Sequence, residues 1–486
     1  MTDLLYGDFR VPENKQFADQ SSLKSLQIAD TFSHFYSDFK KLDRFFYIAD
    51  LQSDREVIAY RQQIIKDFSG IPELLSKLSM LLNKAVEYNT SYTDVKRQYY
   101  SDITRRPRGG GMIDFLSETA WWLKKLLLLQ KDVFDLLASS PVGSDGLCGL
   151  RDDLSKTVKS AEYNELLMIL TRLESKTYFM TGGALEIHLS DGANMSAKYV
   201  LPDGKKPDDP EPSGIRRFFK RKKDNTDISY GKVKIDADLF EDPSFTSSFA
   251  RPMIDELARI IKSVYSEFSN DLYALEFYDV AISYVDYLTE HGIAFCYPRL
   301  GEETEISDLK DLYLLAALRD ETVVPNDFCF KSENDGILII GENGSGKTVY
   351  LRSVASSYLL TNAGLPIPAA SAVIDLPKGI FVMMASSERN LERVGQGGRF
   401  ESEVSDLSQF VHNVSDGSFV FLNEVFQSTS YDEGASALYT VLKHFSKKRV
   451  KWMLVTHLEQ MIAMFEGEDT VTIQKNAKKD GFRFTE

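Results

Sequence analysis

Residues 337–348 read ILIIGENGSGKT, and this stretch decides the fold of the last third of the chain. Its final part, Gly341 to Thr348, matches the pattern GxxxxGK[ST] of a phosphate-binding loop. Because the pattern also occurs by chance, its surroundings decide: an apolar run precedes it, and VYLRSVASSYLL follows with helical periodicity. Strand, glycine-rich loop and helix predict a nucleotide site rather than a glycine-rich turn with an incidental lysine.

Each residue type in this loop has a chemical role. Glycines let backbone N–H groups surround phosphate oxygens, and the helix N-terminus adds the positive end of its dipole. We expect Lys347 to reach the β- and γ-phosphates and the Thr348 hydroxyl to bind Mg²⁺. The predicted contacts of ATP are Gly341, Glu342, Asn343, Gly344, Ser345, Gly346, Lys347, Thr348 and Val349.

Short apolar runs alternate with helical stretches from Asp327 onward. Such strands, separated by helices, indicate a parallel sheet covered on both faces. The pattern predicts an α/β P-loop NTPase domain over residues 321–486. The runs are ILII at 337–340, IFVMM at 380–384, FVFL at 419–422 and WMLV at 452–455.

Polar residues follow two of these runs. Asn423 and Glu424 stand where P-loop ATPases usually carry Asp and then Glu. Glu424 can serve as general base toward water, and Asn423 can offer Mg²⁺ or a coordinated water only a neutral oxygen. We therefore predict weaker metal binding or slower hydrolysis. His457 follows the last run; a lone histidine is usually structural, but one strand after Glu424 it is placed to contact the γ-phosphate or the attacking water.

The loop from Ser386 to Phe400, SSERNLERVGQGGRF, carries three glycines that allow close approach to an anion, including a partner subunit's nucleotide. A flexible surface loop explains it equally well.

The first 320 residues are mainly helical by pattern, with apolar side chains at three- and four-residue steps. Near Tyr178 the pattern changes to short alternating runs with Gly, Asp and Pro, which predicts a small β insertion at about 178–245. The predicted fold class is α+β multidomain: an all-α bundle with this insertion over residues 1–320, followed by the α/β P-loop domain.

The net charge and the local charge clusters point in opposite directions on whether the protein binds nucleic acid. The net charge of −15 is unusual for a DNA-binding protein, but basic residues cluster at 104–111 and at 215–223. Solvated loops and DNA contacts remain equally open for these clusters. The candidate DNA contacts are Arg216, Arg217, Lys220, Arg221, Lys222 and Lys223.

Composition narrows the class of protein. The three cysteines form no CxxC pair, which argues against a zinc site or a disulfide framework and fits a reducing cytoplasm. The longest uncharged stretch, Ser353 to Ile374, contains a glycine and two prolines, unlike a membrane span. We expect a cytoplasmic protein with no membrane partner.

With these elements in order, the last third resembles the ATPase domain of the MutS family. The resemblance rests on VPNDF at 324–328, the loop and its helix, the turn at 363–369, NEVFQSTSYDEG at 423–434 and VTHLEQM at 455–461. It implies an ATPase with catalytic Lys347, Glu424 and His457, and with Thr348 and Asn423 at Mg²⁺.

Residues 42–68 and 272–300 resemble, more loosely, the core and the long returning helix of that family. The helical region would then be a lever and the basic β insertion a clamp on DNA. The resemblance implies a homodimer that couples ATP binding and hydrolysis to clamp closure on duplex, mismatched or branched DNA, in mismatch repair or related DNA processing.

Four departures from the family's pattern bear on this hypothesis. We expect the mismatch-reading and connector domains to be absent, because the resembling region already begins near residue 40, and we expect the family's dimerising segment to be absent after FRFTE. Asn423 replaces the family's Asp. Gly398 and Arg399 stand where the signature loop has Ser and Thr, which affects activation of a partner's site.

Two alternatives remain. One is a nucleotide-gated scaffold with little hydrolysis and no DNA specificity, favoured by Asn423 and the acidic charge. The other, a transport ATPase of the ABC type, lacks an LSGGQ signature in this sequence.

Overall fold

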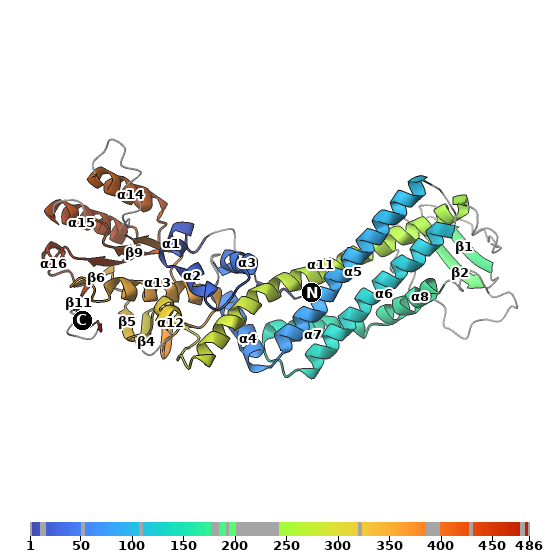
Figure 1. Ribbon diagram of the computed structural model, residues 1–486, viewed down its shortest axis with the longest axis horizontal. Coiled ribbons are helices and arrows are strands. Elements are labelled where there is room, and N and C mark those ends of the chain that lie inside the picture. Colours follow the sequence, from blue (N-terminus) through green and yellow to red (C-terminus); the bar gives the residue numbers. More distant parts are fainter. Residues whose placement is uncertain are drawn as a thin grey trace. The chain divides into compact units, whose positions relative to one another are not determined.

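A computed structural model describes most of the chain (Figure 1). Its residues group by contact into two compact units, which are described separately. The sheet unit comprises Leu4–Pro72, Ser144–Gly146 and Glu276–Glu486, and the helical unit comprises Met1–Asp3, Glu73–Gly143 and Leu147–Leu275. The described residues are 2–9, 16–49, 54–105, 110–175, 184–190, 194–200, 243–318, 323–384, 399–426, 431–476 and 482–484.

A five-stranded parallel sheet forms the centre of the sheet unit, with the strand order β11-β6-β10-β9-β8. The four apolar runs that predicted a parallel sheet are four of these strands. The bounds are β6 Gly336–Gly341, β8 Ile380–Met384, β9 Phe419–Asn423, β10 Lys451–Thr456 and β11 Val471–Asn476. β9 is buried along its whole length, as a central strand covered on both faces must be.

Helices pack on this sheet through apolar stripes. α15 (Tyr431–Lys447) places Leu438, Leu442 and Phe445 in one core cluster with β6, β9 and β10. α13 (Lys347–Ala363) is buried almost throughout. It ends at Gly364, whose φ of +84° suits glycine and where a Cβ would lie 2.8 Å from Arg61. α14 (Arg399–Asn413) and α16 (Gln460–Met464) complete this part.

A smaller four-stranded sheet has the order β3-β7-β4-β5. Its strands are β3 Arg299–Leu300, β4 Thr304–Leu309, β5 Asn326–Phe330 and β7 Ser371–Ile374. The short helix α12 (Leu312–Leu318) lies between β4 and β5 in the chain. β5 contains the stretch NDF that follows Val324 and Pro325, so this sheet brings that motif to the phosphate-loop helix, where the Tyr350 hydroxyl donates to the Asp327 carbonyl at 2.8 Å.

The N-terminal segment of the sheet unit protects the edge of the parallel sheet. The Ile380 N–H donates to the Phe17 carbonyl at 2.6 Å, and the Val382 N–H donates to the Ser22 hydroxyl at 2.7 Å. These bonds satisfy edge groups of β8 that would otherwise invite pairing with another chain. The helices here are α1 Gln20–Ser25, α2 Ile28–Ser33, α3 Phe39–Ala49 and α4 Arg55–Gly70.

The helical unit is built around α6, which packs against α5 and α8. Its helices are α5 Leu74–Arg105, α6 Gly110–Ser139, α7 Asp145–Val158 from Leu147 on, α8 Ala161–Glu174 and α11 Pro243–Glu290 up to Leu275. Leucines of α6, such as Leu123 and Leu126, are buried, whereas Trp121 and Trp122 are only half-buried. The two indoles therefore border the core rather than fill it.

One antiparallel hairpin, β1 (Ala184–Ser190) with β2 (Asn194–Val200), falls within the predicted β insertion. Residues 243–245 of the predicted insertion belong to α11, and the rest of it lies outside the described residues. The predicted division at residue 320 stays a prediction, although contacts group residues 4–72 and 276–320 with the phosphate loop.

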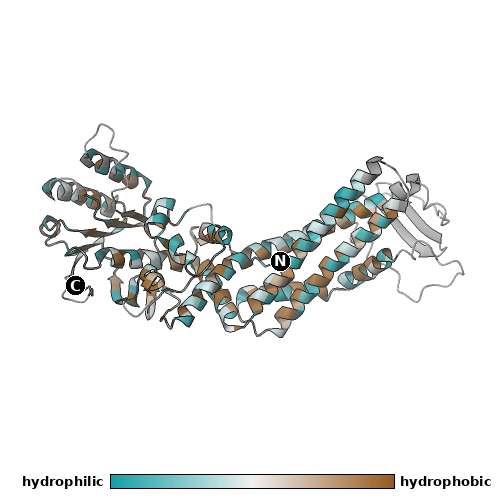
Figure 2. Ribbon diagram, in the orientation of Figure 1, coloured by the Kyte–Doolittle hydropathy of each residue, from teal (hydrophilic) through white to brown (hydrophobic). Residues whose placement is uncertain are grey.

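Hydrophobic and hydrophilic residues share each long helix (Figure 2), as expected where one face packs and the other meets water. Across the described ranges, no helix combines the length and the apolar character needed to cross a bilayer.

Candidate nucleotide-binding site

The phosphate loop leaves β6 and enters α13 through two glycines in left-handed backbone conformations. Gly344 has a φ of +74° and Gly346 a φ of +93°, values that side chains with a Cβ rarely adopt. α13 then begins at Lys347. The strand, loop and helix predicted from residues 337–348 are therefore present, and the loop geometry explains why glycine stands at these two positions.

The Lys347 side chain folds back over its own loop. Only 4% of the residue is exposed, and its Nζ donates to the carbonyls of Gly341 at 2.8 Å and Glu342 at 2.9 Å. Burial lowers the pKa of Lys347 from its ordinary value, and the nearby Glu424 carboxylate opposes that shift. The loop thus holds a buried cation whose neutralisation by an anionic ligand would be favourable.

Thr348 and Asn423 meet at the start of α13. The Thr348 hydroxyl donates to the Asn423 Oδ1 at 3.0 Å. Two oxygens that bind one Mg²⁺ at about 2.1 Å in neighbouring octahedral positions lie about 3.0 Å apart, so this pair fits the ion as adjacent ligands. Both ligands are neutral, and the remaining positions would have to come from phosphate oxygens and water.

Glu424 follows β9 on a sharply turned backbone. Its φ is +50°, an unusual value for a non-glycine residue, and its N–H donates to the Val455 carbonyl of the neighbouring strand at 2.8 Å. Strained backbone of this kind concentrates at functional sites. Here it places Glu424 in the wall of the cavity that contains Lys347 and Thr348.

His457 is the first residue after β10, which lies between β6 and β9 in the sheet. Its strand therefore ends between the strand of the phosphate loop and the strand of Glu424. His457 is half-buried and is not among the residues that line the cavity. The strand order supports the predicted neighbourhood, and the contact with a γ-phosphate stays a prediction.

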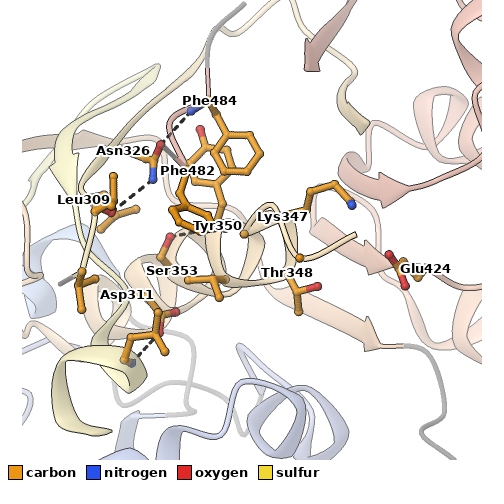
Figure 3. A pocket seen from close by; sticks show the side chains of 16 residues that line it. Leu309, Asp311, Asn326, Lys347, Thr348, Tyr350, Ser353, Glu424, Phe482 and Phe484 are labelled. Atoms are coloured by element: carbon orange, nitrogen blue, oxygen red, sulfur yellow. Dashed lines mark hydrogen bonds between the residues drawn. The ribbon is translucent and has the colours of Figure 1, made fainter. Parts of the chain in front are cut away.

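A cavity of about 390 Å³ is lined by Lys347, Thr348 and Glu424, among other residues (Figure 3). One end is formed by the phosphate loop, and the other by apolar side chains from three separate segments. In this view Glu424 and the Asn326 side of the cavity lie at opposite ends, with Lys347 and Thr348 between them. The lining is Leu309, Asp311, Leu314, Val323, Val324, Asn326, Gly344, Gly346, Lys347, Thr348, Val349, Tyr350, Ser353, Glu424, Phe482 and Phe484.

Of the predicted nucleotide contacts, five line this cavity: Gly344, Gly346, Lys347, Thr348 and Val349. The sequence patterns did not single out Asp311, Phe482 or Phe484 as site residues. Asp311 directly precedes α12, and the two phenylalanines follow β11; none of the three belongs to a recognisable sequence motif. Their role depends on tertiary contacts between segments far apart in the chain.

A buried ion pair fixes the wall of the cavity beside α13. Arg352 donates from Nε to Asp311 Oδ2 at 2.9 Å and from Nη2 to Oδ1 at 2.7 Å, while its Nη1 donates to the Gln27 Oε1 at 2.9 Å. The Leu314 N–H also donates to Asp311 Oδ1 at 2.8 Å. This two-pronged pair locks the helix that carries the phosphate loop to α12 and to the N-terminal segment.

Other predicted features lie outside the described residues. These include the six DNA-contact candidates between 216 and 223 and the glycines of the loop at 386–400. Within the described ranges, no group of three or more His, Cys, Asp or Glu side chains is arranged to hold a metal ion.

Comparison with known proteins adds independent support. Residues 337–484 match the family model of MutS domain V. The DNA mismatch repair protein MutS 1 of Haloarcula marismortui is 30% identical over 153 residues, which is 31% of this chain and 16% of that protein. The match thus spans less than a fifth of the relative's length. The range 337–484 matched by the family model contains the loop, Asn423, Glu424 and His457. Residues 337–484 are therefore identified as a MutS domain V.

Proposed function

We propose that this chain binds and hydrolyses Mg²⁺–ATP, and that its nucleotide state controls the closing of the helical unit and its basic insertion on DNA. One observation carries the first part: a single cavity is lined by the glycine-rich loop with its buried lysine, by Thr348 and by the Glu424 carboxylate, and the Thr348 hydroxyl is hydrogen-bonded to Asn423. These are the groups that phosphoryl transfer to water requires.

Each group has a distinct role in this proposal. The loop amides and Lys347 hold the phosphates, and Thr348 and Asn423 present their oxygens to the metal ion. Mg²⁺, when bound, neutralises charge on the phosphate oxygens. Glu424 accepts a proton from the attacking water, and His457, at the end of the strand between loop and base, orients that water or the γ-phosphate.

The binding step is tested by titrating the full chain with labelled ATP in the presence of magnesium. Lys347→Ala is expected to weaken binding by about 100-fold or more, because Lys347 is the cation within the loop. Lys448→Ala, which removes an exposed lysine of the same unit, is the matched control and should bind like the unchanged protein. Equal uptake by both variants, or no uptake by the unchanged protein, would contradict the proposal.

A second function, a nucleotide-gated scaffold with little hydrolysis, is favoured by one observation. The hydrogen-bond partner of Thr348 is the neutral side-chain amide of Asn423, which would bring no negative charge to Mg²⁺. Single-turnover hydrolysis separates the two functions: bound ATP that persists for hours identifies the scaffold, and bound ATP that is cleaved within minutes identifies the ATPase.

We propose DNA binding and pairing into a homodimer from the likeness of residues 337–484 to MutS domain V and from the basic cluster at 215–223. A titration against homoduplex, mismatched and branched DNA at several salt concentrations tests the contact. The logarithm of the DNA association constant falls linearly with the logarithm of the salt concentration, and each lost phosphate contact makes this line less steep by about 0.9. Replacing Arg216, Arg217, Lys220, Arg221, Lys222 and Lys223 by glutamine should flatten the slope; an unchanged slope would remove these residues from the interface.

A further inference from the structure

Two phenylalanines after β11 differ in how they are held. The Phe484 ring stacks on Tyr350, with centroids 4.4 Å apart and planes at 10°, and its N–H donates to the Asn326 Oδ1 at 2.9 Å. These contacts anchor the segment to α13 and β5. Phe484 is therefore explained by packing alone.

Phe482 is not explained in this way. Phe482 is 45% exposed and lines the cavity. Among the described residues, no aromatic ring stacks on it. Its backbone has a φ of +64°, which costs a bulky residue about 1–2 kcal/mol. A Cβ placed on Gly346 would lie 3.4 Å from its ring, so the ring stands beside the phosphate loop. In Figure 3 Phe482 lies between Asn326 and Lys347.

Most polar groups of the side chains at this end of the cavity have hydrogen-bond partners within the protein; the second N–H of Asn326 has none among the described residues. Asn326 accepts from Phe484 through Oδ1 and donates through Nδ2 to the Val324 carbonyl at 3.4 Å. Asp311 is bound on both oxygens by Arg352, as described above. The Ser353 hydroxyl donates to the Tyr350 carbonyl at 2.8 Å. The rest of this wall is aliphatic: Leu309, Leu314, Val323 and Val324.

Such a wall has consequences for selectivity. Sites that hydrogen-bond to a ligand's polar edge reject analogues by factors of about 10⁴ or more, whereas apolar contact discriminates by only about 10- to 200-fold. Stacking on an aromatic ring accepts any base, because every base has a π face, and a purine offers the larger one.

We propose that Phe482 contacts the base of the nucleotide and that the site binds purine nucleoside triphosphates as a class, ATP and GTP alike. This inference rests on the nucleotide site proposed above. The anchored Phe484 holds the segment in place, and Phe482 presents its ring to the base. The phosphates lie in the loop beside it.

The test uses the full chain with Mg²⁺ and three ligands: ATP, GTP and inorganic tripolyphosphate. ATP and GTP should bind with dissociation constants within about tenfold of each other. Phe482→Ala should weaken both by about tenfold and leave tripolyphosphate unchanged, since that ligand has no base. Phe482→Trp should retain nucleotide affinity. Phe39→Ala, at a phenylalanine of α3 that is 69% exposed, is the matched control.

Three outcomes would overturn the inference. They are a preference of 100-fold or more for ATP over GTP, unchanged nucleotide binding by Phe482→Ala, or equal weakening of tripolyphosphate, which would mean that Phe482 only supports the loop. If the unchanged protein bound tripolyphosphate but neither nucleotide, the base contact alone would fail. If it bound none of the three, the proposed nucleotide site would fail with it.

Discussion

Each unit buries charge, but in a different way. In the sheet unit Arg352 and Asp311 satisfy each other, and Lys347 donates to two carbonyls while facing a cavity. In the helical unit Asp271 is only 5% exposed, and no hydrogen bond to it occurs within the described residues. Burial first, and then the charges of Asp3 and Glu267, raise the pKa of Asp271 well above its ordinary value.

The charges of Arg352, Asp311 and Lys347 position the proposed nucleotide site, whereas the buried carboxyl of Asp271 only lowers the stability of its unit. Paired ions beside the phosphate loop keep α13 in register with the cavity wall, so their loss should damage both folding and binding. An acid without hydrogen bonds is tolerated mainly by staying protonated, so its removal should stabilise the helical unit. Four changes test this contrast, and they follow from the largest expected effect to the smallest.

Breaking the buried pair should have the largest effect. Arg352→Leu leaves Asp311 as an uncompensated buried charge, which costs about 3–5 kcal/mol of unfolding free energy. The chain contains three tryptophans, of which only Trp452 lies in the sheet unit. In a background with Trp121 and Trp122 changed to Phe, Trp452 fluorescence during denaturant unfolding measures that unit alone.

The control for this change is Lys443→Ala. Lys443 pairs with Glu468 at 2.9 Å, but its side chain is 40% exposed, so its loss should cost less than about 1 kcal/mol. Equal costs for the two variants would show that the Arg352 pair does not anchor the helix of the phosphate loop.

Removing the proposed base should separate binding from chemistry. Glu424→Gln keeps the shape of the residue but loses the carboxylate, so hydrolysis should fall by about 100-fold or more while ATP affinity changes little. The measurement is single-turnover cleavage of bound ATP. Glu333→Gln, at an exposed glutamate of the same unit, is the control. Undiminished cleavage would assign the base to another group.

How far the sequence predicts this site depends on how local each feature is. The phosphate loop, its strand and its helix are contiguous, and continuous apolar runs identify β6, β8, β9 and β10. Asn423 and Glu424 were found because they directly follow such a run. β11 was not among the predicted strands, because this edge strand is only partly buried and alternates with polar residues.

The missed features all depend on contacts between distant segments. Nothing in the local pattern around Ser22 indicates that it accepts a hydrogen bond from Val382, 360 residues further on. The same holds for Asp311 and for Phe484, whose partner Asn326 is 158 residues away. Short polar or aromatic stretches have no periodicity of their own, so only the folded chain reveals them.

Restoring the usual acid of the family should produce a smaller effect. Asn423→Asp places a negative charge on the oxygen that meets the Thr348 hydroxyl, so half-maximal hydrolysis should need about tenfold less Mg²⁺. A magnesium titration of hydrolysis measures this. Asn334→Asp, at another asparagine of the sheet unit, controls for added charge. Unchanged magnesium dependence would mean that residue 423 does not contact the metal.

The smallest effect should come from the helical unit. Asp271→Asn removes a buried carboxylate, which should stabilise this unit by about 1 kcal/mol at pH 7. The sign follows from linkage: the folded state holds a proton that the unfolded state releases, so stability falls as the pH rises from the ordinary pKa of 3.8 toward the raised folded value. In the variant this part of the pH dependence should disappear.

Fluorescence of Trp121 and Trp122 in a Trp452→Phe background reports the helical unit during denaturant unfolding at pH 4 and pH 8. Asp255→Asn, at an exposed aspartate of the same helix, is the matched control and should leave the slope between the two pH values unchanged. A destabilised Asp271→Asn variant would mean that the carboxylate has a stabilising role, and the contrast between the two units would then be wrong. A stabilised variant would show that a buried carboxylate lowers the stability of the helical unit, in contrast to the Arg352–Asp311 pair, which we expect to stabilise the sheet unit.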